Sequence, residues 1–161
     1  MRLAGWNCRG MGNGPAVRGL LDFQKMEDPD LLFLCETKMK GKEMCRFKYM
    51  LGMHGMVARD CEGRSGGIVL FWKKEINVKL CSFSKYHIDV QIEESDGFKW
   101  RFTGIYGEPV ADKREITWKL MRILKQQNNL PWLCMGDFNE TLFSSDFFSR
   151  NARPEWQMRA F

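Results

Sequence analysis

Four polar residues follow apolar segments of the sequence, at points where strands are expected to end. Asn7 and Glu36 each come directly after an apolar run, and Asp137 and Asn139 follow a third run. Ligands gather where the strands of α/β folds end, because the loops there can converge. If the three segments are neighbours, two carboxylates and two amides meet in one small site. Magnesium takes one or two carboxylates and completes its shell with water and substrate phosphates. The residue types therefore indicate a hard-cation site, unless each residue only caps its own strand or turn.

The elements that would position these residues alternate between helix and strand and then become a run of strands. Asn13 and Pro15 suit the start of a first helix. His87, Asp89 and Gln91 alternate with apolar residues, which predicts a strand with one solvent-facing side. The order indicates an α/β protein with a mixed sheet. The expected helices lie at 15–26, 44–51 and 112–127, and the expected strands at 3–8, 31–35, 53–58, 67–72, 78–83, 86–92, 98–106 and 131–135.

Length and composition are those of one globular domain. The chain has 161 residues, within the range of about 100–200 residues that is usual for a domain. Hydrophobic residues make up 44% and charged residues 28%, which excludes a disordered or acidic solvating chain. We expect a single domain over residues 1–161. Its motif-bearing part covers 1–139, and an irregular tail without a clear helix or strand period covers 140–161.

The sequence also limits where the protein acts and what it meets. No apolar run approaches the length of about 20 residues that spans a bilayer, and the N-terminus turns polar early. We expect an intracellular protein, in the nucleus or cytoplasm, without a visible targeting segment or membrane association. Its six cysteines form no CxxC pair, so we expect them to be reduced. The formal net charge of +5 is compatible with phosphate-bearing partners.

Five short motifs occur in a fixed order, and together they are more specific than any one residue. Their order resembles that of the endonuclease/exonuclease/phosphatase superfamily, and most of all that of the endonuclease domain of plant non-LTR (LINE-type) retrotransposons. The resemblance runs from Met1 to Phe161. It implies a two-sheet α/β sandwich of the DNase I-like type, and a magnesium-dependent hydrolase, with Mn²⁺ as an alternative ion, that cuts DNA phosphodiester bonds. The motifs are Trp6-Asn7-Cys8-Arg9-Gly10, Leu34-Cys35-Glu36-Thr37-Lys38, Gly66-Gly67-Ile68, Gly104-Ile105-Tyr106-Gly107-Glu108-Pro109 and Gly136-Asp137-Phe138-Asn139-Glu140.

The resemblance implies a role for each matching residue. Glu36 would bind the metal, and Asn7 beside it would help to organise the metal and the scissile phosphate. Tyr106 would contact the phosphate. Asp137 would orient or deprotonate the attacking water, and Asn139 would stabilise the charged phosphorane. These roles agree with the needs of phosphodiester hydrolysis, which are charge neutralisation at the non-bridging oxygens and an aligned water.

Two departures from the family pattern bear on activity. Arg9 stands where abasic-site endonucleases carry an acidic residue, which favours the retroelement branch over the DNA-repair branch. Arg9 cannot bind magnesium but can pair with a phosphate. The family's C-terminal Ser-Asp-His segment is absent, as are the final strands, and His54 and His87 are the chain's only histidines. Loss of a general acid or base typically costs about 10²–10⁴-fold in rate. We therefore expect a C-terminally truncated domain that is inactive or weakly active alone.

Further basic residues could hold a DNA backbone near this site. Lys38 and Lys40 follow Glu36, and Arg64 precedes the Gly66-Gly67 motif. A solvated basic loop is the plainer interpretation of these residues. His87 either contacts the substrate or forms an ordinary surface pair with Asp89.

Two other functions are compatible with the same sequence. One is a non-catalytic nucleic-acid-binding remnant. The other is an intact small phosphodiesterase or phosphatase that uses His87 in place of the missing histidine. DNA is the expected partner in the leading interpretation, and the sequence indicates no protein partner.

Overall fold

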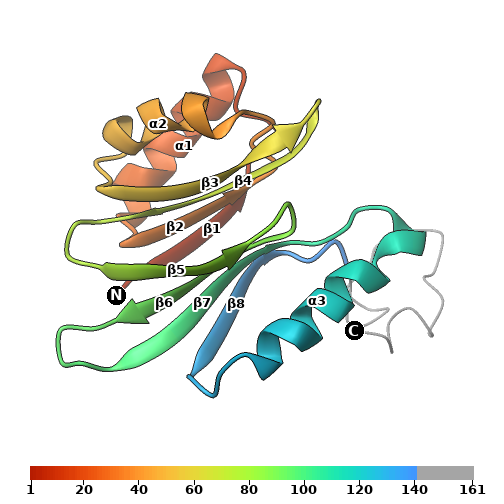
Figure 1. The fold of residues 1–161 in the computed structure, drawn as a ribbon. Coiled ribbons are helices and arrows are strands. Elements are labelled where there is room, and N and C mark those ends of the chain that lie inside the picture. The colour runs from red at the N-terminus through yellow and green to blue at the C-terminus, as the bar shows by residue number, and fades with distance from the viewer. Residues whose placement is uncertain (141–161) are drawn as a thin grey trace. The chain divides into compact units, whose positions relative to one another are not determined.

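The computed structural model describes residues 1–140. The expected tail therefore lies outside the described residues from position 141 onward. No helix in the described part is long and apolar enough to cross a membrane. The elements, drawn in Figure 1, are β1 (Leu3–Asn7), α1 (Gly14–Glu27), β2 (Leu31–Cys35), α2 (Gly41–Met50), β3 (Gly55–Glu62), β4 (Ser65–Trp72), β5 (Asn77–Phe83), β6 (His87–Glu93), β7 (Lys99–Tyr106), a 3₁₀ turn (Ala111–Lys113), α3 (Glu115–Gln126) and β8 (Trp132–Asp137).

The chain forms two compact units. The first comprises Met1–Tyr106 and Leu130–Gly136, and the second comprises Gly107–Asn129 together with the segment that begins at Asp137. The first unit contains two four-stranded sheets with the strand orders β1-β2-β4-β3 and β5-β6-β7-β8. β1 runs parallel to β2, which pairs antiparallel with β4, so the first sheet is mixed. The expected α/β class and the two-sheet sandwich are confirmed.

The two sheets face each other across an apolar core. β2 contributes Leu31, Phe33 and Cys35 to this core, and β6 contributes Ile88, Val90 and Ile92. The rings of Phe33 and Phe102 meet edge to face at 6.5 Å between their centroids. β2 is buried on both sides, which explains why its sequence, Leu-Leu-Phe-Leu-Cys, is apolar without alternation.

Helices α1 and α2 cover the other face of the first sheet, as Figure 1 shows. Leu32 and Leu34 of β2 point to this side and belong to one buried cluster with Leu20 of α1 and Phe47 of α2. The start of α1 agrees with the sequence, because the Asn13 side chain accepts a hydrogen bond of 2.8 Å from the Ala16 amide.

One expectation about β6 is wrong. His87 and Asp89, predicted on a solvent-facing side, are only 4% and 0% exposed, so they do not form a surface pair. The reason is a polar network that supplies partners on that face. Asp89 Oδ1 accepts hydrogen bonds from Arg101 Nε at 2.7 Å and from Thr103 Oγ1 at 2.6 Å. The Trp132 indole in turn donates to Thr103 Oγ1 at 2.7 Å. Polar side chains that satisfy one another can be buried without losing their hydrogen bonds.

Gly104 allows the two sheets to approach, and its replacement tests the packing. A Cβ at Gly104 would lie 2.3 Å from the Phe33 ring, so we expect Gly104→Ala to displace that ring. The overpacked core should lower the free energy of unfolding by about 1–3 kcal/mol, measured by urea denaturation. Gly12→Ala is the control, because a Cβ at Gly12 meets no atom within 4 Å. Equal stability of the two variants would contradict this account of the core.

Candidate functional site

Asn7 and Glu36 form a side-chain pair at the carboxyl ends of β1 and β2. The parallel register places Asn7 opposite Cys35, the last residue of β2, and Glu36 directly follows that strand. Asn7 Nδ2 donates to Glu36 Oε1 at 3.1 Å, and Asn7 Oδ1 accepts from the Arg9 amide at 3.0 Å. One amide side chain therefore holds both the carboxylate and the start of the next loop.

The loops that follow β1 and β2 are strained and tied together. Arg9, Glu36 and Lys38 have φ angles of 50°, 52° and 54°, in the left-handed region that non-glycine residues rarely adopt. Such conformations cost about 1–3 kcal/mol each and persist only where the surroundings hold them. Two backbone hydrogen bonds hold the loops together. The Cys8 amide donates to the Cys35 carbonyl at 2.9 Å, and the Met11 amide donates to the Thr37 carbonyl at 2.9 Å. The loops are thus fixed in advance, with Arg9, Glu36 and Lys38 at their left-handed positions.

The Gly66-Gly67 motif brings β4 against the Glu36 loop. The amides of Thr37 and Lys38 donate to the carbonyls of Gly67 and Gly66, at 3.0 and 2.9 Å. Gly67 has a φ of 83°, and a Cβ there would lie 2.4 Å from Thr37 Oγ1. The motif therefore serves close packing beside Glu36.

The expected basic residues lie around this edge of the first sheet. Lys38 and Lys40 are exposed, and Lys38 Cδ lies 3.4 Å from the position of a Cβ on Gly10 in the neighbouring loop. Arg64 is exposed in the turn between β3 and β4, two residues before Gly66. Tyr106 is different, because it ends β7 inside the core between the sheets and is 6% exposed.

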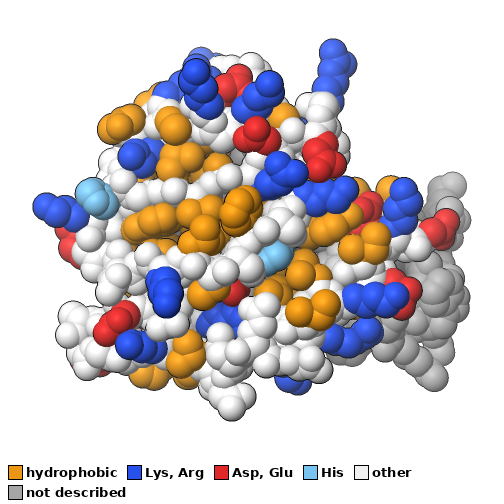
Figure 2. Space-filling view, in the orientation of Figure 1, with side chains coloured by type: hydrophobic (Ala, Val, Ile, Leu, Met, Phe, Trp, Pro, Cys, Tyr) orange, Lys and Arg blue, Asp and Glu red, His pale blue; other side chains and the backbone are white. Residues whose placement is uncertain are grey.

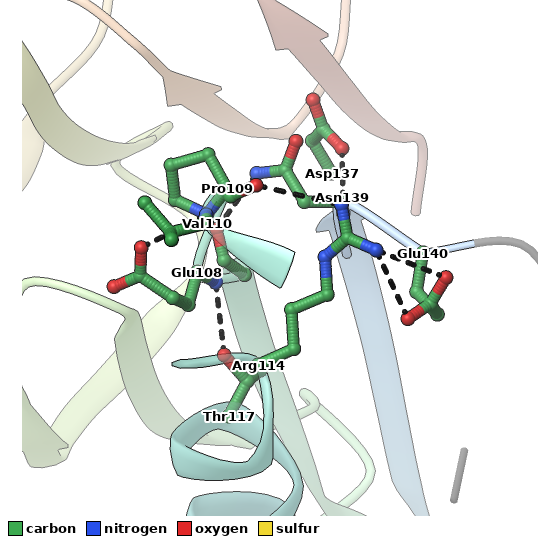
Figure 3. A network of polar contacts seen from close by, with 9 residues as sticks. Glu108, Pro109, Val110, Arg114, Thr117, Asp137, Asn139 and Glu140 are labelled. Atoms are coloured by element: carbon green, nitrogen blue, oxygen red, sulfur yellow. Dashed lines mark hydrogen bonds and ion pairs between the residues drawn. The ribbon is translucent and has the colours of Figure 1, made fainter. Parts of the chain in front are cut away.

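Asp137 and Asn139 form a second group, within the second unit (Figure 3). The Asn139 amide donates to Asp137 Oδ1 at 2.9 Å, and Asn139 Nδ2 donates to the Gly107 carbonyl at 2.7 Å. The Gly107 amide donates to the Asp137 carbonyl at 2.8 Å. Asn139 has a φ of 52°, another left-handed residue. The last part of the Gly-Asp-Phe-Asn motif is therefore a fixed turn bound to the Gly107 backbone.

Sequence reasoning missed the residues that support this turn. Arg114 Nη1 lies 3.3 Å from Glu140 Oε2, and Arg114 Nη2 donates to the Pro109 carbonyl at 3.4 Å. The Glu108 amide donates to Thr117 Oγ1 of α3 at 2.9 Å. Little in the sequence indicated these contacts, because Glu140 is the last residue of a motif and Arg114 falls inside the expected helix 112–127, whereas α3 begins at Glu115.

His87 lies in the first unit, where two serines bind its ring. Ser82 Oγ is 2.9 Å from Nε2, and Ser84 Oγ is 2.8 Å from Nδ1. Burial lowers the pKa of His87 below its ordinary value, opposed in part by the negative charge of Asp89. Both ring nitrogens thus have partners within the chain, and a role of His87 toward a substrate stays a prediction.

The profile of the Endonuclease/Exonuclease/phosphatase family matches residues 4–159. The chain belongs to this family. No curated protein sequence matches it.

Solved structures of DNA-processing proteins share the fold. An AP endonuclease from Archaeoglobus fulgidus aligns with a TM-score of 0.73 at 15% identity, over 99% of this chain and 68% of that one. A 3′ phosphatase from Neisseria, bound to a product DNA hairpin, gives 0.66 at 14% identity, over 92% and 62%. The AP endonuclease LMAP from Leishmania major gives 0.61 at 15% identity, over 83% and 53%. At these identities the likeness concerns the fold, and the chain spans about half to two thirds of the length of these structures.

Members of the family generally depend on a divalent metal. Among residues 1–140, no three His, Cys, Asp or Glu side chains are grouped so as to enclose a metal ion. Glu36 supplies one carboxylate, oriented by Asn7. A single carboxylate suits magnesium, which keeps several waters and shares substrate phosphates. The residues therefore fit a weakly held magnesium ion.

The lowered pKa of His87 predicts a loss of stability in mild acid. The unfolded chain binds a proton at this imidazole more readily than the folded chain does. The contribution of neutral His87 to the free energy of unfolding is therefore fully present above about pH 6.5 and falls as the pH drops below that value. We expect the urea midpoint to fall between pH 7 and pH 5 and His87→Gln to reduce that fall. His54→Gln, at an exposed position, is the control. A parallel fall in the wild type and His87→Gln would contradict the assignment.

Proposed function

We propose that this chain binds DNA through its phosphate backbone and carries part of the active site of a magnesium-dependent endonuclease. The observation that carries the proposal is the Asn7–Glu36 pair. Asn7 ends β1 and Glu36 directly follows β2, and Glu36 itself has a left-handed backbone conformation. A DNA-cleaving enzyme of this family needs a fixed carboxylate for its metal at such a position.

The residues of the first unit would bind and orient the substrate. Glu36 would hold a magnesium ion, with Asn7 keeping its carboxylate in place. When bound, the ion supplies charge neutralisation at the non-bridging oxygens of the phosphate. Arg9 and Lys38 would pair with neighbouring phosphates, with Lys40 and Arg64 along the backbone. The buried position of Tyr106 suits a fixed hydroxyl that contacts a phosphate.

The residues of the second unit would handle the water and the developing charge. Asp137 would orient or deprotonate the attacking water. Asn139 uses one N–H of its amide on the Gly107 carbonyl, and an amide nitrogen has two hydrogens. The second would stabilise the phosphorane. The left-handed backbone of Asn139 holds this side chain in one direction.

We also propose a retroelement origin and slow turnover of the isolated chain. Arg9 supports the first point, because it replaces the acidic residue of abasic-site endonucleases. The lack of a Ser-Asp-His segment in the 161 residues supports the second. Its DNA substrate would be met in the nucleus or cytoplasm.

DNA binding can be tested through its salt dependence. Figure 2 shows basic and acidic side chains together on the surface over α1 and α2. Contacts with the DNA phosphates should therefore depend on individual basic side chains. We expect Arg9→Gln and Lys38→Gln each to weaken binding to a duplex and to reduce the slope of log K against log salt by about 1. Fluorescence anisotropy measures both. Lys79→Gln, at an exposed position on β5, is the matched control. An equal effect of all three variants would indicate that binding depends on the overall charge and not on a site at Arg9 and Lys38.

Catalysis can be tested on supercoiled plasmid with magnesium. We expect slow nicking that stops with a chelator and falls by at least about 10²-fold in Glu36→Gln and in Asp137→Asn. His54→Gln should nick at the wild-type rate. DNA binding without any magnesium-dependent nicking would instead favour the non-catalytic binding remnant.

A further inference from the structure

An ion pair of the second unit has both of its side chains largely buried. The side chains of Arg114 and Glu140 are 12% and 1% exposed. Arg114 Nη1 contacts both oxygens of Glu140, at 3.4 and 3.3 Å. Removing one member of a buried pair leaves an uncompensated charge, which makes such pairs costly to disrupt. A pair of this kind on a small loop needs a structural reason.

The pair connects the end of the Asp137–Asn139 turn to the segment 107–114, with Arg114 and Glu140 lying 26 residues apart in the sequence (Figure 3). Glu140 follows Asn139 directly, and Arg114 stands immediately before α3. Arg114 Nη2 also reaches the Pro109 carbonyl, which lies two residues after Gly107. The Gly107 carbonyl in turn accepts a hydrogen bond from the Asn139 side chain. The contacts therefore close a ring that runs from Asn139 through Glu140, Arg114 and Pro109 back to Gly107.

The shape of the guanidinium suits this ring. Its planar fork presents separate N–H groups, so one nitrogen can serve the carboxylate while the other serves the carbonyl. Lysine offers one compact ammonium and could not match both positions with the same geometry. Glu140 lies next to a residue at a φ of 52°, and its fixed carboxylate therefore helps to keep Asn139 in that conformation.

We propose that Arg114 and Glu140 are positioning residues that hold the Asp137–Asn139 turn against Gly107. They act through the backbone of the turn and touch no reacting atom. The consequence for DNA cleavage rests on the proposed function, whereas the consequence for the turn itself does not.

Amide hydrogen exchange of the full chain tests the proposal without any nuclease activity. Glu140→Gln and Arg114→Lys should speed exchange at the amides of Gly107, Glu108 and Asn139 by at least roughly tenfold. Amides between β6 and β7 should keep their protection. Lys119→Gln is the matched control, because it breaks an exposed 3.1 Å ion pair with Glu115 on the same helix. It should leave all of these rates unchanged.

Two results would overturn the proposal. One is unchanged exchange at Gly107 and Asn139 in both variants. The other is loss of protection in β6 and β7 as well, because the pair would then serve the whole fold. Nicking adds a second readout, in which both variants should lower kcat with little change in KM. If the wild-type chain does not nick DNA, the proposed function fails while the exchange result still decides the role of the ion pair.

Discussion

The parallel register of β1 on β2 is the constraint on which the candidate site depends. It places Asn7 opposite Cys35, and Glu36 then comes within 3.1 Å of the Asn7 amide. A shift by one residue would turn every side chain of β1 to the other face. Such a shift is resisted by β2, which is buried on both sides and bonded to β4 on its far edge. The apolar core thus determines where the polar pair lies.

Backbone strain is concentrated where the chemistry is proposed. Of the five non-glycine residues with positive φ in residues 1–140, Asp28 caps α1, and the others are Arg9, Glu36, Lys38 and Asn139. These four lie in the loops that follow β1, β2 and β8. A loop held in a rare conformation loses little entropy when it binds a ligand, because it was ordered beforehand. The hydrogen bonds from Thr37 and Lys38 to the Gly66-Gly67 carbonyls are therefore part of the site, although they touch no ligand.

Two features could be predicted from the sequence. The sandwich followed from the family resemblance that the motif order carries, and the Asn7–Glu36 pair followed from polar residues at the ends of apolar runs together with that resemblance. Apolar runs indicate strands, and the carboxyl ends of neighbouring parallel strands lie at the same edge of a sheet. His87 and Asp89 were misplaced because alternation shows only that one side of β6 is polar. It does not show that Arg101 and Thr103 of the neighbouring strand donate hydrogen bonds to Asp89. Arg114 and Glu140 were missed for the same reason. Their contact joins positions 26 residues apart, and no local period marks it.

Within the proposed function, the charges around Glu36 couple the metal to the substrate. Glu36 brings one negative charge, whereas Arg9 and Lys38 on the same two loops bring two positive ones. A dication approaching these loops would meet this repulsion, which would lower its affinity. A phosphodiester that pairs with Arg9 and Lys38 would add negative charge and could supply a further oxygen ligand. Each ligand then raises the affinity for the other by the same factor, as thermodynamic linkage requires. An arginine in place of a second carboxylate would thus make metal binding conditional on the substrate.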